Sequence, residues 1–306
     1  MTTDKILVTG GTGQVGKHLQ EILPTATYLS SSDCDLRNKE EVYDLFKTLK
    51  PTTVIHLAAK VGGISENIQK PADYFTDNIQ MNTNLVEVSK DMGVNQFIAL
   101  LSTCIFPDSL PKDHYPMKEQ MMHLGPPTAT NFSYGYAKRC MAVHIDAVNR
   151  QYGTRFQYLI PSNLYGPYDK YNERSHFVGA LLKKIKDAKE SGKKEIVLMG
   201  DGTPLRQFTY AGDLAHVIKM CFDSGIRENF NVTTNENLSI KEIAELALKV
   251  CEADLKIIWT GEMSGQARKD VSGYWLSRSF PTFQFTRLEE GLKKTWDVLT
   301  KTTANV

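Results

Sequence analysis

Short apolar runs alternate with stretches of helical periodicity through the first half of the chain. Each run is bounded by glycine, proline or polar residues, which is typical of a buried strand. Helical spacing is clearest after residue 38, where Val42, Leu45, Phe46 and Leu49 form one apolar face. The alternation predicts a parallel sheet with helices on both faces. The five predicted strands cover residues 5–8, 27–31, 54–59, 97–101 and 156–160.

Three predicted helices begin with a cap motif. Asn38 is followed by Glu41, Ser239 by Glu242 and Thr286 by Glu289, a spacing typical of the capping box. The last two motifs open helices over 240–251 and 287–299, and a third helix is predicted over 213–222. The second half also contains a strand near 196–198, and Pro and Gly cluster in the loops at 161–167 and 200–204.

The sequence therefore predicts an α/β fold, with a Rossmann-type doubly wound parallel sheet and a smaller, mixed α/β C-terminal subdomain that binds substrate. We expect residues 1–163 to form the cofactor-binding domain, with 206–232 returning to it. Residues 164–205 and 233–306 then form the substrate subdomain.

Composition narrows the class of protein. The 306 residues carry 36 Lys and Arg against 35 Asp and Glu, and this balance excludes nucleic acid as the expected main partner. The five cysteines lie far apart and none has metal-ligand spacing, so we expect neither a disulfide framework nor a metal. No apolar run approaches the roughly 20 residues that span a bilayer. We expect a cytoplasmic protein with no membrane contact.

A glycine-rich turn follows the first strand and opens a helix. Gly10, Gly13 and Gly16 allow a tight turn and a close approach of the backbone to a pyrophosphate, while the N-terminus of the helix, at Gln14 and Val15, offers N–H donors. This context predicts a dinucleotide site.

The end of the second strand indicates which dinucleotide is bound. It carries Ser30, Ser31 and Ser32, with no carboxylate for a ribose 2′-hydroxyl until Asp33, which favours NADPH over NADH. Asp35 and Leu36 follow; they lie either near the adenine or in the turn before the next helix.

Three further residues fit a carbonyl reductase. Ser102 ends the fourth strand, and Tyr134 and Lys138 lie four residues apart on one face of a predicted helix. We expect a neighbouring ammonium to lower the pKa of the phenol, so that Tyr134 protonates a carbonyl oxygen while Ser102 hydrogen-bonds it.

Together these motifs resemble the extended short-chain dehydrogenase/reductases, which act mostly on nucleotide sugars. The resemblance covers nearly the whole chain and includes segments 56–59, 161–167 and 206–213. It implies a homodimer that pairs through two helices, here about 72–92 and 134–151. It also implies that the cofactor is lined by Leu57, Ala58, Ala59, Lys138, Pro161, Asn163, Leu164 and His176.

Within that family, the segment 102–107, with a cysteine two residues after the serine, is similar to the branch that makes GDP-L-fucose. Those enzymes use NADPH to epimerise C3 and C5 and to reduce C4 of GDP-4-keto-6-deoxy-D-mannose. The resemblance implies that Cys104 is the base and His176 the acid of epimerisation.

The resemblance also implies a set of substrate contacts. Arg206 matches a pyrophosphate-binding arginine, and Lys269 a basic position near the substrate. Lys184 replaces an arginine and Met199 a tryptophan of some relatives, while Asn163 and Val178 are expected to line the cleft.

Two alternatives remain open. The chain could only reduce C4 of a related GDP-4-keto sugar, such as a 6-deoxyheptose, because the departures at Lys184 and Met199 affect the nucleotide end. It could also be a regulatory subunit that binds NADP without catalysis, although such proteins usually lack the Tyr or the Lys.

Overall fold

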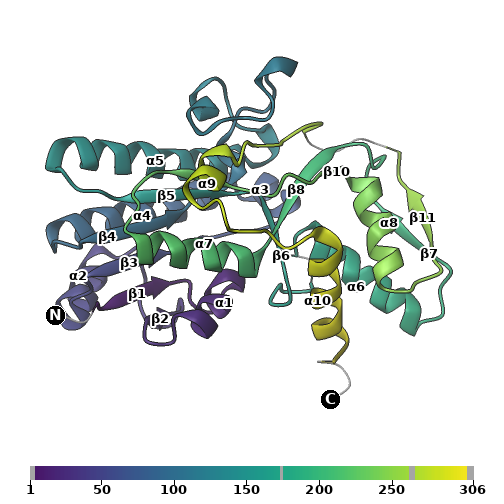
Figure 1. Ribbon diagram of the computed structural model, residues 1–306, viewed down its shortest axis with the longest axis horizontal. Helices are drawn as coiled ribbons and strands as arrows, with labels where there is room; N and C mark the ends of the chain where they lie inside the picture. The colour runs from purple at the N-terminus through teal and green to yellow at the C-terminus, as the bar shows by residue number, and fades with distance from the viewer. Residues whose placement is uncertain (1–3, 173–174, 262–265, 302–306) are drawn as a thin grey trace.

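The computed structural model describes residues 4–172, 175–261 and 266–301, which form two parts side by side (Figure 1). The larger part contains a six-stranded sheet and holds the N-terminus, and the smaller part contains the C-terminal helix.

The large sheet is parallel throughout, with strand order β2-β1-β3-β4-β5-β9. Its order reverses direction between β1 and β3, as in a doubly wound fold, and ligands bind such sheets at the carboxyl ends of the strands. This confirms the predicted fold class. The strands are β1 (Ile6–Thr9), β2 (Thr27–Leu29), β3 (Thr53–His56), β4 (Gln96–Leu100), β5 (Gln157–Pro161) and β9 (Phe230–Val232).

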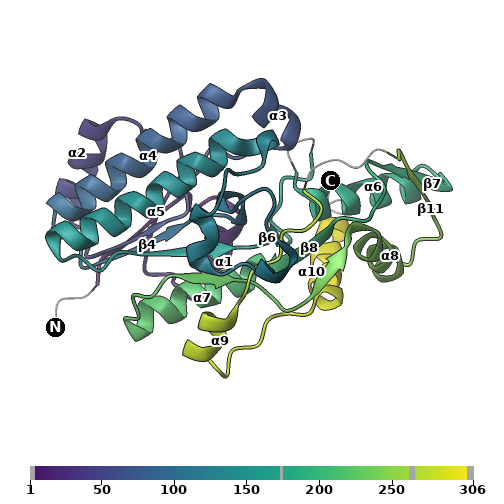
Figure 2. The same ribbon diagram turned by 90° about the horizontal axis from the view of Figure 1, so that it is seen from above.

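Helices cover both faces of this sheet, and most of its strands are therefore buried along their whole length. Figure 2 shows α2 (Lys39–Leu49), α4 (Pro71–Asp91) and α5 (Phe132–Tyr152) on one face. The other face is covered by α1 (Gln14–Ile22), α7 (Ala211–Ser224) and α9 (Tyr274–Ser279). Each face has its own hydrophobic cluster, one including Phe46 and Phe97 and the other including Leu19 and Ile218.

The smaller part is built on two short sheets. One has the order β10-β8-β6, with β6 (Asn163–Tyr165), β8 (Leu205–Tyr210) and β10 (Asn237–Ser239). The other pairs β7 (Glu195–Leu198) with β11 (Lys256–Trp259) in parallel. Three helices pack around a separate core there: α6 (Phe177–Glu190), α8 (Ile240–Val250) and α10 (Leu288–Lys301).

The chain passes between the two parts at Ser162. This residue separates β5 of the large sheet from β6 of the small one, and its hydroxyl lies 2.8 Å from that of Thr209 on β8. Residues 205–210 lie in the small sheet and 230–232 in the large one. The domain boundaries stated above stay a prediction.

Two of the three predicted helix caps are confirmed. Asn38 accepts hydrogen bonds from the backbone of Glu40 and Glu41, and Ser239 and Glu242 form a reciprocal capping box. The prediction for Thr286 is wrong, because its N–H and hydroxyl both donate to Asp213 on α7.

Glu236 supplies the missing acceptor at α10. Its carboxylate accepts the N–H of Leu288, the first residue of that helix. A side chain 52 positions upstream thus takes the role predicted for Thr286.

Replacement of Phe97 by Ala should lower the free energy of unfolding by about 3–5 kcal/mol, since the ring is completely buried and packs 5.1 Å from that of Phe156. Urea denaturation would measure the loss. The matched control is Leu124→Ala, at a side chain that is 56% exposed, where we expect a change below about 0.5 kcal/mol. Equal losses in the two variants would contradict this packing.

Candidate active site

The glycine turn lies against the end of β3. Gly10 has a φ of +71°, which a residue with a side chain rarely adopts, and a Cβ placed there would lie 2.7 Å from the backbone nitrogen of Ala58. The N–H of Gly13 donates to the carbonyl of Gly10, which closes the turn. The backbone therefore adopts the tight approach that the glycine spacing predicts.

The turn ends at an uncapped helix N-terminus. Gly13 is the N-cap of α1 and has no side chain with which to bind the first N–H groups of Gln14, Val15 and Gly16. Such a terminus suits a pyrophosphate. Leu57, Ala58 and Ala59 follow β3 beside this turn, and all three are half-buried. The residues present thus fit the dinucleotide that the sequence predicts.

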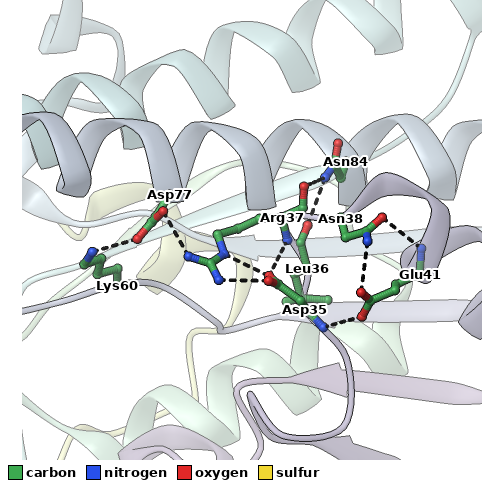
Figure 3. A network of polar contacts seen from close by, with 8 residues as sticks. All are labelled: Asp35, Leu36, Arg37, Asn38, Glu41, Lys60, Asp77 and Asn84. Atoms are coloured by element: carbon green, nitrogen blue, oxygen red, sulfur yellow. Dashed lines mark hydrogen bonds and ion pairs between the residues drawn. The ribbon is translucent and has the colours of Figure 1, made fainter.

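Asp35 and Leu36 lie in a polar network between β2 and α4 (Figure 3). Both carboxylate oxygens of Asp35 accept from Arg37, whose guanidinium also binds Asp77 on α4 at 3.2 Å. Arg37 lowers the pKa of Asp35 to about 2. Asp77 in turn binds Lys60, from the loop after β3, at 2.6 Å.

This network is consistent with both positions predicted for Asp35, near the adenine and in the turn before the next helix. The residue lies in the turn before α2, and its backbone N–H donates to Glu41 on that helix. Its carboxylate is nevertheless at the carboxyl edge of the sheet, where the network reaches from β2 to the loop after β3.

The catalytic segment predicted after β4 forms a short 3₁₀ turn, Thr103–Ile105. The hydroxyl of Ser102 accepts the N–H of Cys104 at 3.2 Å. Both residues follow β4, at the carboxyl edge of the sheet. The backbone carbonyl of Cys104 lies against Gly135 on α5, where a Cβ would come within 2.5 Å of it. A helix residue other than glycine would push α5 away from this turn.

Lys138 and Tyr134 lie on α5 as predicted, but their electrostatics differ from the expectation. Lys138 is almost completely buried and donates to the carbonyl of Leu100 at 2.8 Å. Burial lowers the pKa of Lys138 to about 7. The pKa of Tyr134 is raised by burial and by the charge of Cys104, not lowered by Lys138. Tyr134 is therefore a neutral phenol in this structure, ready to donate a proton.

Cys104 has the most polar surroundings of the five cysteines. Its sulfur is the acceptor of Asn131 Nδ2 at 3.0 Å and of Lys269 Nζ at 3.3 Å. Burial raises the pKa of the thiol, but the ammonium of Lys269 and hydrogen bonds from Ser102, Lys269 and Asn131 outweigh it, and the pKa ends below its ordinary value.

His176 lies apart from that group. It is the N-cap of α6 and is exposed, and its charge acts on Asp169, a half-buried carboxylate in the loop after β6. Within the described residues, no contact joins its ring to Cys104 or Tyr134. Residues 173–174, next to it, lie outside the described residues.

The predicted substrate residues spread over the smaller part. Arg206 on β8 is half-buried and donates to the carbonyls of Leu205 and Gln266. Lys184 on α6 donates to the carbonyl of Val197 at 2.7 Å, and Met199, just after β7, is 76% exposed. The contacts of Arg206 and Lys184 are thus to backbone carbonyls of the smaller part, and the substrate roles of these residues stay a prediction.

The remaining predicted residues are more buried. Asn163 donates to the carbonyl of Gln207, and Pro161 and Leu164 flank the crossing between the sheets. Val178, which we expected to line the cleft, is instead fully buried in the core beside Leu181. Its side chain therefore packs inside the smaller part and does not line a cleft.

Sequence reasoning assigned no role to two residues of the site. Asn131 lies three positions before Tyr134 and could have been selected from the segment Asn131–Tyr134. Asn82 on α4 lies 3.0 Å from the ring of His56, whose other nitrogen lies 2.8 Å from Thr9. Burial, with the charge of Lys138, lowers the pKa of His56 to about 3, so it is a neutral structural residue.

A dinucleotide cradle joined to a Ser–Tyr–Lys set at the carboxyl edge of a parallel sheet defines a Rossmann-type oxidoreductase. The chain belongs to the NAD dependent epimerase/dehydratase family, whose model matches residues 6–233.

Two curated relatives resemble it over nearly their whole length. The GDP-L-fucose synthase of Dictyostelium discoideum is 36% identical over 96% of this chain and 95% of its own. The GDP-L-colitose synthase of Yersinia pseudotuberculosis is 34% identical over 95% of this chain and 96% of its own.

A solved structure agrees with them. The GDP-L-fucose synthetase of Naegleria fowleri, bound to NADP, superimposes with a TM-score of 0.89 at 32% identity. The comparison covers all of this chain and 95% of that one.

No group of three or more His, Cys, Asp or Glu side chains is arranged to hold a metal ion in the described part of the chain. Among the helices at 4–172, 175–261 and 266–301, none combines the length and apolarity needed to cross a membrane.

Gly10→Ala should weaken NADPH binding by about tenfold or more, because the new Cβ would push the turn away from Ala58. Titration of NADPH fluorescence would measure this. Gly153→Ala is the matched control: Gly153 has a nearly identical φ of +68°, but a Cβ placed there would have no other atom within 4 Å. If both variants bound NADPH like the unaltered protein, the turn would not be the cofactor site.

Proposed function

We propose that this chain converts GDP-4-keto-6-deoxy-D-mannose to GDP-L-fucose with NADPH, by epimerisation at C3 and C5 and reduction at C4. The observation that carries the proposal is the Cys104 thiol, next to Ser102 and Tyr134 and in contact with Lys269. A reductase alone needs no such thiol. The full-length similarity to GDP-L-fucose synthases supports the same substrate.

NADPH, when bound, supplies the hydride for C4. Gly10, Gly13, Gln14, Val15 and Gly16 would hold its pyrophosphate at the N-terminus of α1. The predicted lining further includes Asp35, Leu36, Leu57, Ala58, Ala59, Lys138, Pro161, Asn163, Leu164 and His176.

Epimerisation requires a base and an acid beside the sugar. The 4-ketone acidifies the C–H bonds at C3 and C5, so a proton can leave from one face and return to the other. We assign proton removal to the Cys104 thiolate and proton return to His176, whose exposed position at the start of α6 lets it approach a bound sugar from the side of the smaller part.

Reduction uses the other half of the site. Tyr134 is kept as a phenol by burial and by the charge of Cys104. It can therefore donate its proton to the C4 oxygen, with Ser102 as a second donor. Arg206 and Lys184 would supply positive charge for the GDP moiety, and Met199 would complete that end.

An incubation in D₂O tests the proposal directly. The protein would receive GDP-4-keto-6-deoxy-D-mannose and NADPH, and NMR with mass spectrometry would locate deuterium in the product. GDP-L-fucose labelled at both C3 and C5 is expected. A C4-reduced sugar without that label would favour the reductase-only alternative, and an absence of NADPH oxidation would overturn the proposal.

Two variants should separate the half-reactions. Tyr134→Phe should slow C4 reduction by about 10²–10⁴-fold while solvent deuterium still enters the substrate, because the phenol acts only in proton donation. Cys104→Ala should abolish the label at C3 and C5. Deuterium entry that survives in Cys104→Ala would contradict the role of this thiol.

The same proposal includes a homodimer formed through α4 and α5. These helices lie side by side on one flank of the molecule (Figure 2). They expose Phe75, Tyr136 and Val143, with a cavity of about 260 Å³ between them. We further propose a cytoplasmic location, which suits five cysteines that are all free.

Val143→Glu should weaken the dimer by more than about 100-fold, since each subunit would bury an unpaired carboxylate in the interface. Light scattering after size exclusion would measure the mass. Val197→Glu is the matched control, because Val197 on β7 is 51% exposed, as is Val143. A dimer that persists in Val143→Glu, or a monomeric unaltered protein, would contradict the proposed interface.

A further inference from the structure

Lys269 reaches the active site from a segment far along the chain. Residues 266–271, here called the strap, cross from the smaller part to the turn after β4. The side chain of Gln266 donates to the carbonyl of Pro107 at 3.0 Å, and the carbonyl of Ala267 accepts the N–H of Leu205. At the other end, the carbonyl of Asp270 accepts the N–H of Met117 at 3.0 Å. Both ends of the strap are therefore held.

The ammonium of Lys269 is buried by this arrangement. The residue is 9% exposed, and its Nζ lies 3.3 Å from the sulfur of Cys104. The neighbouring carboxylate, Asp270, is bound to Arg268 at 2.5 Å. Within the described ranges no carboxylate forms an ion pair with Lys269. A buried ammonium is costly without a negative partner, and a thiolate at Cys104 would supply one.

Asn131 approaches the same sulfur from another direction. Its Nδ2 lies 3.0 Å from the Cys104 sulfur and can only donate, so the sulfur accepts from both Asn131 and Lys269. Two donors aimed at one sulfur favour its anionic form. Other charged or titratable groups that act on Cys104 are Arg206, from β8, and Tyr134, from α5.

We propose that Lys269 and Asn131 are positioning residues that hold Cys104 as a thiolate, the form that can remove a proton next to the ketone. For Lys269 this role differs from contact with the GDP phosphates. The part that concerns proton removal rests on the proposed function. The thiolate itself does not, because it is a property of the protein without substrate.

The arrangement also connects the two half-reactions. The charge that Lys269 stabilises on Cys104 raises the pKa of Tyr134. Loss of the Lys269 charge would therefore affect both groups in opposite directions: Cys104 would become a neutral thiol, and Tyr134 would ionise more readily. Burial keeps Tyr134 protonated, and the charge that Lys269 stabilises on Cys104 adds to that effect.

Alkylation of Cys104 by iodoacetamide tests the thiolate without any substrate. The full-length protein would be treated from pH 5 to 9, and mass spectrometry would follow the Cys104 and Cys140 peptides separately. Cys140 is exposed in the single subunit and lies on α5, the helix of the proposed dimer face, so its profile serves as the internal reference for variants that keep the oligomeric state of the unaltered protein. In Lys269→Met we expect the midpoint pH of the Cys104 alkylation profile to rise by about one unit or more, while the Cys140 profile stays unchanged. Asn131→Leu should shift it in the same direction by less.

Two further variants make the test specific. Lys269→Arg retains the charge and should keep most of the reactivity of Cys104. Lys184→Met removes a cation from the nucleotide end and should leave the alkylation profile unchanged. Thermal melting of each variant would identify any that fail to fold, and Lys269→Arg then carries the comparison.

Kinetics give the second measurement. In Lys269→Met the acidic limb of the kcat profile should move to higher pH, with deuterium entry at C3 and C5 reduced at pH 7. An unchanged alkylation profile together with a raised KM for the GDP-sugar would overturn the inference and return Lys269 to phosphate binding. If the alkylation profile shifts but the unaltered protein shows no epimerisation, the proposed function is refuted. The inference that Lys269 stabilises the Cys104 thiolate is then still supported.

Discussion

The active site depends on how α5 is docked against the turn after β4. The ammonium of Lys138 donates to the carbonyl of Leu100, and the guanidinium of Arg139 donates to that of Ile105 at 2.9 Å through Nε. Between them, Gly135 lets the helix approach the carbonyl of Cys104. Two buried basic side chains thus donate to backbone carbonyls at the end of β4 and in the turn that follows it. Because these contacts bracket Cys104, they set its position relative to Tyr134.

Burial alone would leave every group of this site neutral. It raises the pKa of Tyr134, lowers that of Lys138 to about 7 and lowers that of His56 to about 3. Cys104 is the exception, since Lys269 and the hydrogen bonds to its sulfur outweigh burial. A site with one neutral acid and one anionic base suits a reaction that first removes a proton beside a carbonyl and then delivers one to its oxygen. The environment moves the pKa values of Cys104 and Tyr134 in opposite directions, which is the arrangement that an acid–base pair needs.

The sequence predicted most of the larger part because its signals are local. Apolar runs, glycine spacing and the Asn38 and Ser239 caps depend on residues within a few positions of one another. The cap at Thr286 could not be predicted, because Asp213, 73 residues away, takes its donors. The same applies to the contact between Lys269 and Cys104, which are 165 residues apart. The direction in which the pKa of Tyr134 shifts also depends on burial, and burial cannot be inferred from the four-residue spacing of Tyr134 and Lys138.

The position of the strap explains why the site needs both parts of the chain. The thiol lies on the larger part, at the edge of the parallel sheet, while the cation that acts on it comes after β11, from the sequence of the smaller part. A single residue, Ser162, separates the two sheets, and its bond to Thr209 ties β8, which carries Arg206, to that crossing. Such a short connection limits how far the parts can move independently. The base therefore has its counter-charge only in the fully assembled fold, and the sequence distance between Cys104 and Lys269 is bridged by packing rather than by any local motif.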